Sequence, residues 1–67
     1  MTEKYVGTNQ WKYRYFKSPI GIIKLLLYVY IKPNYINIAE YNLALDFTEE
    51  QIDAYVKSEI DRIEVAK

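Results

Sequence analysis

The chain has 67 residues, of which nine are basic and nine are acidic, and it contains neither cysteine nor histidine. Disulfide bonds are therefore excluded, and the usual ligands of a structural zinc ion are missing. A domain of this size buries only roughly 60% of the surface that its unfolded chain exposes. Because no crosslink can add stability, we expect the protein to self-associate, most simply as a homodimer, through a tyrosine-rich sheet face or an edge strand.

The charges cancel in sum but separate along the chain. Residues 1–39 carry six basic side chains and one acidic one, a net charge of +5. Residues 40–67 carry eight acidic and three basic side chains, a net charge of −5. A folded domain with a basic part and an acidic part can dock onto a polarised partner or onto its own kind.

The first predicted strand covers residues 10–17. Aromatic and basic side chains alternate there with a period of two, which is typical of a strand. The alternation separates two sets, either of which can face the core: Trp11, Tyr13 and Tyr15, or Lys12, Arg14 and Phe16. Residues 1–9, which precede this strand, are polar and are predicted to be disordered.

A second strand is predicted for residues 22–32, after a turn at residues 18–21. Proline fixes φ and glycine accepts a positive φ, so the sequence Ser-Pro-Ile-Gly can reverse the chain. Residues 25–31 are all apolar, whereas a strand with one solvated face alternates between apolar and polar. Both faces of this strand therefore need cover.

The third predicted extended segment, residues 35–47, changes phase along its length. Ile36 and Ile38 occupy even positions, whereas Tyr41 and Leu43 occupy odd ones. One extra residue is needed if both sets are to share a face, which predicts a β-bulge near Ala39 and Glu40. A tight hairpin at residues 40–42, which would give four short strands, is the alternative.

A helical segment is predicted for residues 48–66. The sequence Thr48-Glu-Glu-Gln51 is a capping box, which marks a helix start. Apolar residues then recur at steps of three and four, at Ile52, Tyr55, Val56, Ile60 and Ile63. The predicted fold is a single α+β domain, residues 1–67, with an antiparallel meander of three or four strands in residues 10–47 and one C-terminal helix packed on one face.

Enzymatic chemistry is not expected of this chain. Without histidine and cysteine, it lacks the commonest general base and the thiolate nucleophile. Glycine occurs only at positions 7 and 21, so no loop is suited to cradle a phosphate. We therefore predict no catalytic residue, no cofactor and no metal site.

Protein binding is the predicted function, because one helix can cover only one face of a sheet that is apolar on both. The candidate contact residues are aromatic and basic, as in interface cores: Trp11, Lys12, Tyr13, Arg14, Tyr15, Tyr28 and Tyr30. A second, acidic surface is formed by Asp53, Asp61 and Glu64. By analogy with small accessory proteins of phages and other mobile elements, we expect a cytoplasmic protein that binds and inhibits a host protein.

Single-stranded nucleic acid is the alternative partner. Tyrosine rings on adjacent strands can stack on bases while Lys12 and Arg14 hold phosphates. The zero net charge weakens this alternative, since counterion release dominates non-specific affinity. No membrane partner is expected, because the polar face of the predicted helix is acidic and anionic lipids would repel it.

Overall fold

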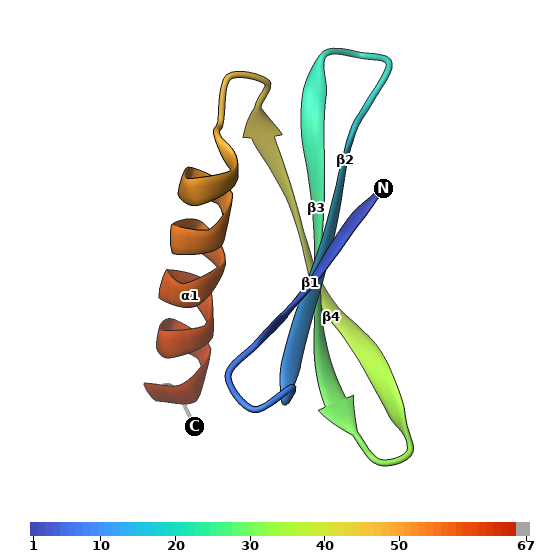
Figure 1. The fold of residues 1–67 in the computed structure, drawn as a ribbon, viewed down its shortest axis with the longest axis vertical. Coiled ribbons are helices and arrows are strands. Elements are labelled where there is room, and N and C mark those ends of the chain that lie inside the picture. The colour runs from blue at the N-terminus through green and yellow to red at the C-terminus, as the bar shows by residue number, and fades with distance from the viewer. Residues whose placement is uncertain (66–67) are drawn as a thin grey trace.

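The computed structural model describes residues 1–65 as four strands followed by one helix (Figure 1). The elements are β1 (Thr2–Val6), β2 (Trp11–Lys17), β3 (Ile22–Ile31), β4 (Asn34–Ala44) and α1 (Glu49–Val65). The strands form one antiparallel sheet in the order β1-β2-β3-β4. The predicted α+β fold with a C-terminal helix on one face is therefore confirmed. Residue 66 of the predicted helical segment lies outside the described residues.

Strand β1 shows that the prediction of disorder for residues 1–9 is wrong. It pairs with β2 along its whole length, with Thr2 opposite Tyr15 and Val6 opposite Trp11. The turn between them contains two residues with positive φ, 69° at Gly7 and 65° at Asn9. Glycine and asparagine are the residues that tolerate this region best, so the turn closes a hairpin without strain. Polar side chains suit an edge strand, which is exposed to water on its outer side.

Strand β4 is continuous, so the alternative hairpin at residues 40–42 is also wrong. Its register with β3 changes from Leu27 opposite Ala39 to Tyr28 opposite Asn37, which leaves Ile38 without a partner. This is the predicted bulge, placed one residue earlier than expected. The Asn37 side-chain amide donates to the carbonyl oxygens of Leu27 (3.1 Å) and Ala39 (3.2 Å). These bonds satisfy carbonyl groups at the irregularity and stabilise it.

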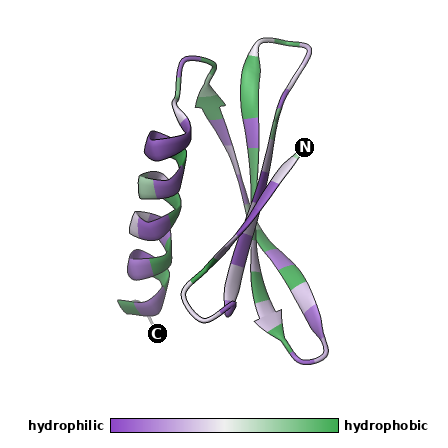
Figure 2. Cartoon of the chain, in the orientation of Figure 1, coloured by the Kyte–Doolittle hydropathy of each residue, from purple (hydrophilic) through white to green (hydrophobic). Residues whose placement is uncertain are grey.

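Helix α1 begins at the predicted capping box. The Thr48 N–H donates to Gln51 Oε1 at 2.9 Å, and the Gln51 N–H donates to Thr48 Oγ1 at 3.2 Å. The predicted apolar positions face the sheet: Ile52, Val56 and Ile60 are buried, and Tyr55 and Ile63 pack against the same core. Figure 2 shows the hydrophilic side of the helix turned away from the sheet.

The core lies between α1 and one face of the sheet, and it decides which side of β2 points inward. From the sheet it contains Trp11, Tyr13, Ile23, Leu25, Leu27 and Leu43. The alternate residues of β2, Lys12, Arg14 and Phe16, therefore point to the opposite face. Within residues 1–65, no helix has the length and apolar character needed to cross a membrane.

Candidate functional site

The face of the sheet opposite α1 is the candidate site, and we call it the open sheet face. Figure 1 shows the helix on only one side of the sheet. Strand alternation and register assign to this face Glu3 and Tyr5 of β1, Lys12, Arg14 and Phe16 of β2, Lys24, Leu26, Tyr28 and Tyr30 of β3, and Tyr35, Asn37, Glu40 and Asn42 of β4. No other element of the described chain covers these residues.

Four tyrosines at one end of the open sheet face form a cluster around a lysine. We call Tyr5, Tyr28, Tyr30 and Tyr35 the tyrosine cluster. Tyr35 contacts Tyr5 edge to face with ring centroids 5.7 Å apart, and its centroid lies 5.1 Å from that of Tyr30. Lys12 Nζ lies 4.7 Å from the Tyr35 centroid and 5.2 Å from the Tyr28 centroid. These are cation–π distances, and they leave the Lys12 side chain only 17% exposed.

Hydrogen bonds hold this cluster to the backbone. The Tyr35 hydroxyl donates to the carbonyl oxygen of Asn9 in the β1–β2 turn. Close to the cluster, the Gln10 side-chain amide donates to the carbonyl oxygen of Tyr30 at 3.1 Å. These bonds hold the Tyr35 ring and the backbone at Tyr30 in place.

Next to the tyrosine cluster, Glu3 is shared by two basic side chains. Its Oε2 atom lies 2.8 Å from Arg14 Nε and 3.7 Å from Lys12 Nζ. The Tyr5 hydroxyl donates to Glu3 Oε1 at 3.3 Å, and the negative charge of Glu3 is the main cause of a raised pKa for Tyr5. Further along the face, Lys24 Nζ lies 3.9 Å from Glu40 Oε2. The open sheet face thus combines tyrosines with ion pairs that are partly open to water.

The structure divides the seven predicted contact residues between the two sides of the sheet. Lys12, Arg14, Tyr28 and Tyr30 lie on the open sheet face. Trp11 and Tyr13 are buried in the core, so their predicted role in contacting a partner is wrong. Tyr15 is half-buried on the helix side, where its hydroxyl donates to Glu49 Oε1 at 3.1 Å. The aromatic side chains of β2 face the helix because α1 packs against large apolar surfaces, which the basic side chains of β2 supply less well.

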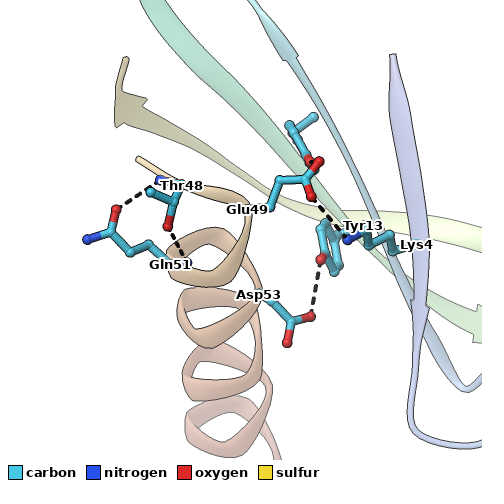
Figure 3. Close-up of polar contacts among 7 residues, drawn as sticks. Lys4, Tyr13, Thr48, Glu49, Gln51 and Asp53 are labelled. Atoms are coloured by element: carbon cyan, nitrogen blue, oxygen red, sulfur yellow. Dashed lines mark hydrogen bonds and ion pairs between the residues drawn. The ribbon is translucent and has the colours of Figure 1, made fainter. Parts of the chain in front are cut away.

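Polar contacts attach the first half of α1 to β1 and β2, as Figure 3 shows. The Tyr13 hydroxyl donates to Asp53 Oδ1 at 3.1 Å, and Lys4 Nζ lies 4.0 Å from Glu49 Oε2. Burial, followed by this hydrogen bond, raises the pKa of Tyr13 far above its ordinary value. These contacts join basic and phenolic groups of the sheet to acidic groups of the helix.

Asp53 therefore differs from the other two residues of the predicted acidic surface. It also lies 2.8 Å from Lys57 Nζ, and the bond to Lys57 is the largest cause of a lowered pKa for Asp53. Because Asp53 accepts a hydrogen bond from Tyr13 and pairs with Lys57, its carboxylate is not available together with those of Asp61 and Glu64 as one acidic surface. Asp61 and Glu64 are exposed.

The sequence candidates did not include Glu3, Tyr5 and Tyr35, which contact the tyrosines and basic side chains of the open sheet face. The first two belong to β1, which the polar composition of residues 1–9 concealed. The sequence Gly7-Thr8-Asn9 between Val6 and a predicted strand is a turn signal that indicates a hairpin there. Tyr35 had no such signal, because its position depends on pairing with β3.

The surface of residues 1–65 has no detectable pocket, and these residues gather no group of three or more side chains suited to a metal ion. Comparisons of the chain with models of protein families, with curated proteins and with solved structures give no match.

Proposed function

We propose that this protein is a non-enzymatic binding module that contacts a protein partner through the open sheet face. The observation that carries this proposal is the exposure of Tyr5 (53%) and Tyr30 (38%) on a sheet face that also carries Arg14 and that no element of the described chain covers. Tyrosine and arginine are enriched in the cores of protein interfaces and among the residues that contribute most to binding. The proposed contact surface has fewer residues than the one predicted from the sequence, because Trp11 and Tyr13 are buried.

The fixed positions of the rings support the same proposal. Binding costs free energy when mobile side chains become ordered. In the tyrosine cluster, Tyr35 is already held by the Asn9 carbonyl oxygen and by its neighbours Tyr5 and Tyr30. A partner would therefore cover rings that are largely ordered beforehand.

The ion pairs favour a protein over a nucleic acid as the partner. Lys12 is enclosed by the tyrosine cluster, and Glu3 neutralises part of the positive charge of Lys12 and Arg14. Few counterions would then be released on binding a phosphate backbone, and that release supplies most of the non-specific affinity for nucleic acid. The biological role that we propose is inhibition of a cytoplasmic host protein whose surface the open sheet face would cover.

Paired surface variants test this function. Tyr5→Ser with Tyr30→Ser removes the exposed rings, and Asp61→Ser with Glu64→Ser is the matched control on the helix. Tagged proteins would capture partners from nuclease-treated lysate, and calorimetry would measure the affinity of the captured protein. We expect the control to retain the partner and the tyrosine variant to lose it while keeping a native circular dichroism spectrum.

Two results would overturn the proposal. The first is retention of the partner by the tyrosine variant at unchanged affinity. The second is micromolar binding of a fluorescent single-stranded oligonucleotide whose affinity falls steeply with salt and disappears in the tyrosine variant. That second result would assign the open sheet face to single-stranded nucleic acid.

A further inference from the structure

Covering the open sheet face would leave one positive charge without a counter-charge. The face carries three basic side chains, Lys12, Arg14 and Lys24, and two acidic ones, Glu3 and Glu40, so its net charge is +1. In the free protein, water solvates this excess. A partner that removes the water must supply a negative group, because a buried charge without a counter-charge costs far more free energy than a solvated one.

Two of the three basic side chains already have stabilising contacts within the chain. Lys24 Nζ lies 3.9 Å from Glu40 Oε2, so these two charges offset each other. Lys12 Nζ lies over the rings of Tyr28 and Tyr35, whose faces attract a cation. A partner would therefore gain little from a new contact with either lysine.

Arg14 is the basic side chain of the open sheet face that a partner can still bind. It contacts Glu3 through Nε at 2.8 Å, but Glu3 shares its single charge with Lys12. Within residues 1–65 the N–H of this Nε has no aligned acceptor, so the contact is an ion pair rather than a two-bond fork. A hydrogen bond with Tyr28 is the largest cause of a raised pKa for Arg14, which places the guanidinium between β1 and β3.

The donors of Arg14 are accessible from the solvent side. Four of the five N–H donors of a guanidinium are on its two terminal nitrogens. The Arg14 side chain is 40% exposed, so a group of a partner can replace the water around it. The planar guanidinium matches a carboxylate, with which it can form two parallel N–H···O bonds.

We propose that the partner protein places one carboxylate, from an aspartate or glutamate side chain, against Arg14, and that the same partner covers Tyr5 and Tyr30 with apolar groups. This inference rests on the proposed function, because it states which chemistry the partner of the open sheet face has. A basic surface would be repelled by Arg14, so this residue selects among proteins that could otherwise cover the tyrosines.

Short random peptides, fused to the N-terminus of a phage coat protein, test this chemistry. In such fusions each peptide carboxylate belongs to an aspartate or a glutamate. The full-length protein selects peptides, and the variant Tyr5→Ser with Tyr30→Ser identifies those that need the exposed rings. We expect the selected peptides to be enriched in acidic residues beside aromatic or aliphatic ones. Calorimetry with synthetic copies measures their affinities.

A double-mutant cycle tests whether the carboxylate binds at Arg14. Changing the acidic residue of the peptide to its amide should weaken binding about tenfold or more, and Arg14→Gln should weaken binding of the original peptide to a similar extent. The two changes together should weaken binding little more than either one alone, because each removes the same contact.

Lys17→Gln is the matched control for Arg14→Gln. It removes a positive charge from an exposed position of the same strand, on the helix side of the sheet. Because salt screens interactions between distant charges, we expect the affinity to stay within about twofold of the wild-type value. Circular dichroism checks the fold of both variants, and the amide peptides test the carboxylate on the wild-type protein.

Three results would overturn the inference. Peptides that need Tyr5 and Tyr30 but contain no carboxylate would refute it and leave the proposed function standing. Losses that add in the cycle would do the same, because the carboxylate would then bind elsewhere. Failure to select any peptide that needs Tyr5 and Tyr30 would count against the proposed function and against this inference with it.

Discussion

Tyr5 and Tyr35 lie on the two outermost strands of the sheet, yet their rings meet edge to face with centroids 5.7 Å apart. Three strand spacings of about 4.8 Å each separate the backbones of β1 and β4. The two side chains therefore reach toward each other across the middle strands, over the region where Lys12 and Tyr28 lie. This contact connects the first strand with the last without any backbone hydrogen bond between them.

Removing the ring of Tyr35 should therefore affect both outer strands. We expect Tyr35→Ala to lower the free energy of unfolding by about 2 to 3 kcal/mol, because it deletes the contacts with Tyr5, Tyr30 and Lys12. Tyr35→Phe keeps the ring and loses only the hydrogen bond to Asn9, at a cost of about 1 kcal/mol. Urea denaturation measures both values. Equal losses in the two variants would show that the ring contacts contribute nothing.

Tyr13 should behave as a core residue rather than as a contact residue. Tyr13→Ala leaves a large cavity under α1 and should cost about 3 to 5 kcal/mol, which is enough to unfold a domain of this size. Tyr13→Phe fills the same space and loses the bond to Asp53, so we expect a loss of about 1 kcal/mol in urea denaturation. If the proposed function holds, the Tyr13→Phe variant should bind the proposed partner with unchanged affinity. A large loss of binding by this folded variant would place Tyr13 at the interface after all.

The stability of the protein should fall at acidic pH. The bond to Lys57 is the main cause that lowers the pKa of Asp53, and the bond to Arg62 is the main cause that lowers the pKa of Glu59. The unfolded chain then binds protons at a higher pH than the native state does. The stability that these groups contribute is complete above their unfolded pKa values, about 3.9 and 4.3, and is lost as the pH falls through the lowered native values.

Urea denaturation at several pH values between 7 and 2 would measure this loss. In Asp53→Asn the free energy of unfolding should depend less on pH below about 4. Asp61→Asn removes a carboxyl group at an exposed position of the same helix and serves as the control. An Asp53→Asn curve that parallels the wild-type curve would contradict the assignment.

The capping box at the start of α1 should contribute measurably to stability. Thr48→Ala removes the oxygen that accepts from the Gln51 N–H, and we expect it to cost about 1 kcal/mol. Thr48→Ser keeps a hydroxyl and should restore most of the loss. Thermal denaturation followed by circular dichroism compares the three proteins, and identical melting temperatures would argue against this cap.

The elements that sequence reasoning located correctly have local signals. The capping box of Thr48 and Gln51 and the apolar spacing from Ile52 to Ile63 define α1 without reference to the rest of the chain. The phase change between Ile38 and Tyr41 located the bulge to within one residue, because the period of a strand is fixed at two.

The features that sequence reasoning missed depend on tertiary pairing. In the sequence, either face of β2 is suited to the core. The packing of α1 on Trp11 and Tyr13 decides which face points inward. Strand β1 is short and polar, and it is stable because β2 offers it a partner. The tyrosine cluster joins Tyr5 of β1 to Tyr35 of β4, so no short stretch of sequence contains it.

The bulge gives β4 one residue more than the part of β3 with which it pairs. Loss of Ile38 would leave both neighbouring pairs intact, Leu27 with Ala39 and Tyr28 with Asn37, and every other side chain would stay on its own side of the sheet. Loss of a residue from a regularly paired stretch of the sheet would exchange inner and outer side chains. Position 38 is therefore where chains of this fold can differ in length while keeping the same surfaces.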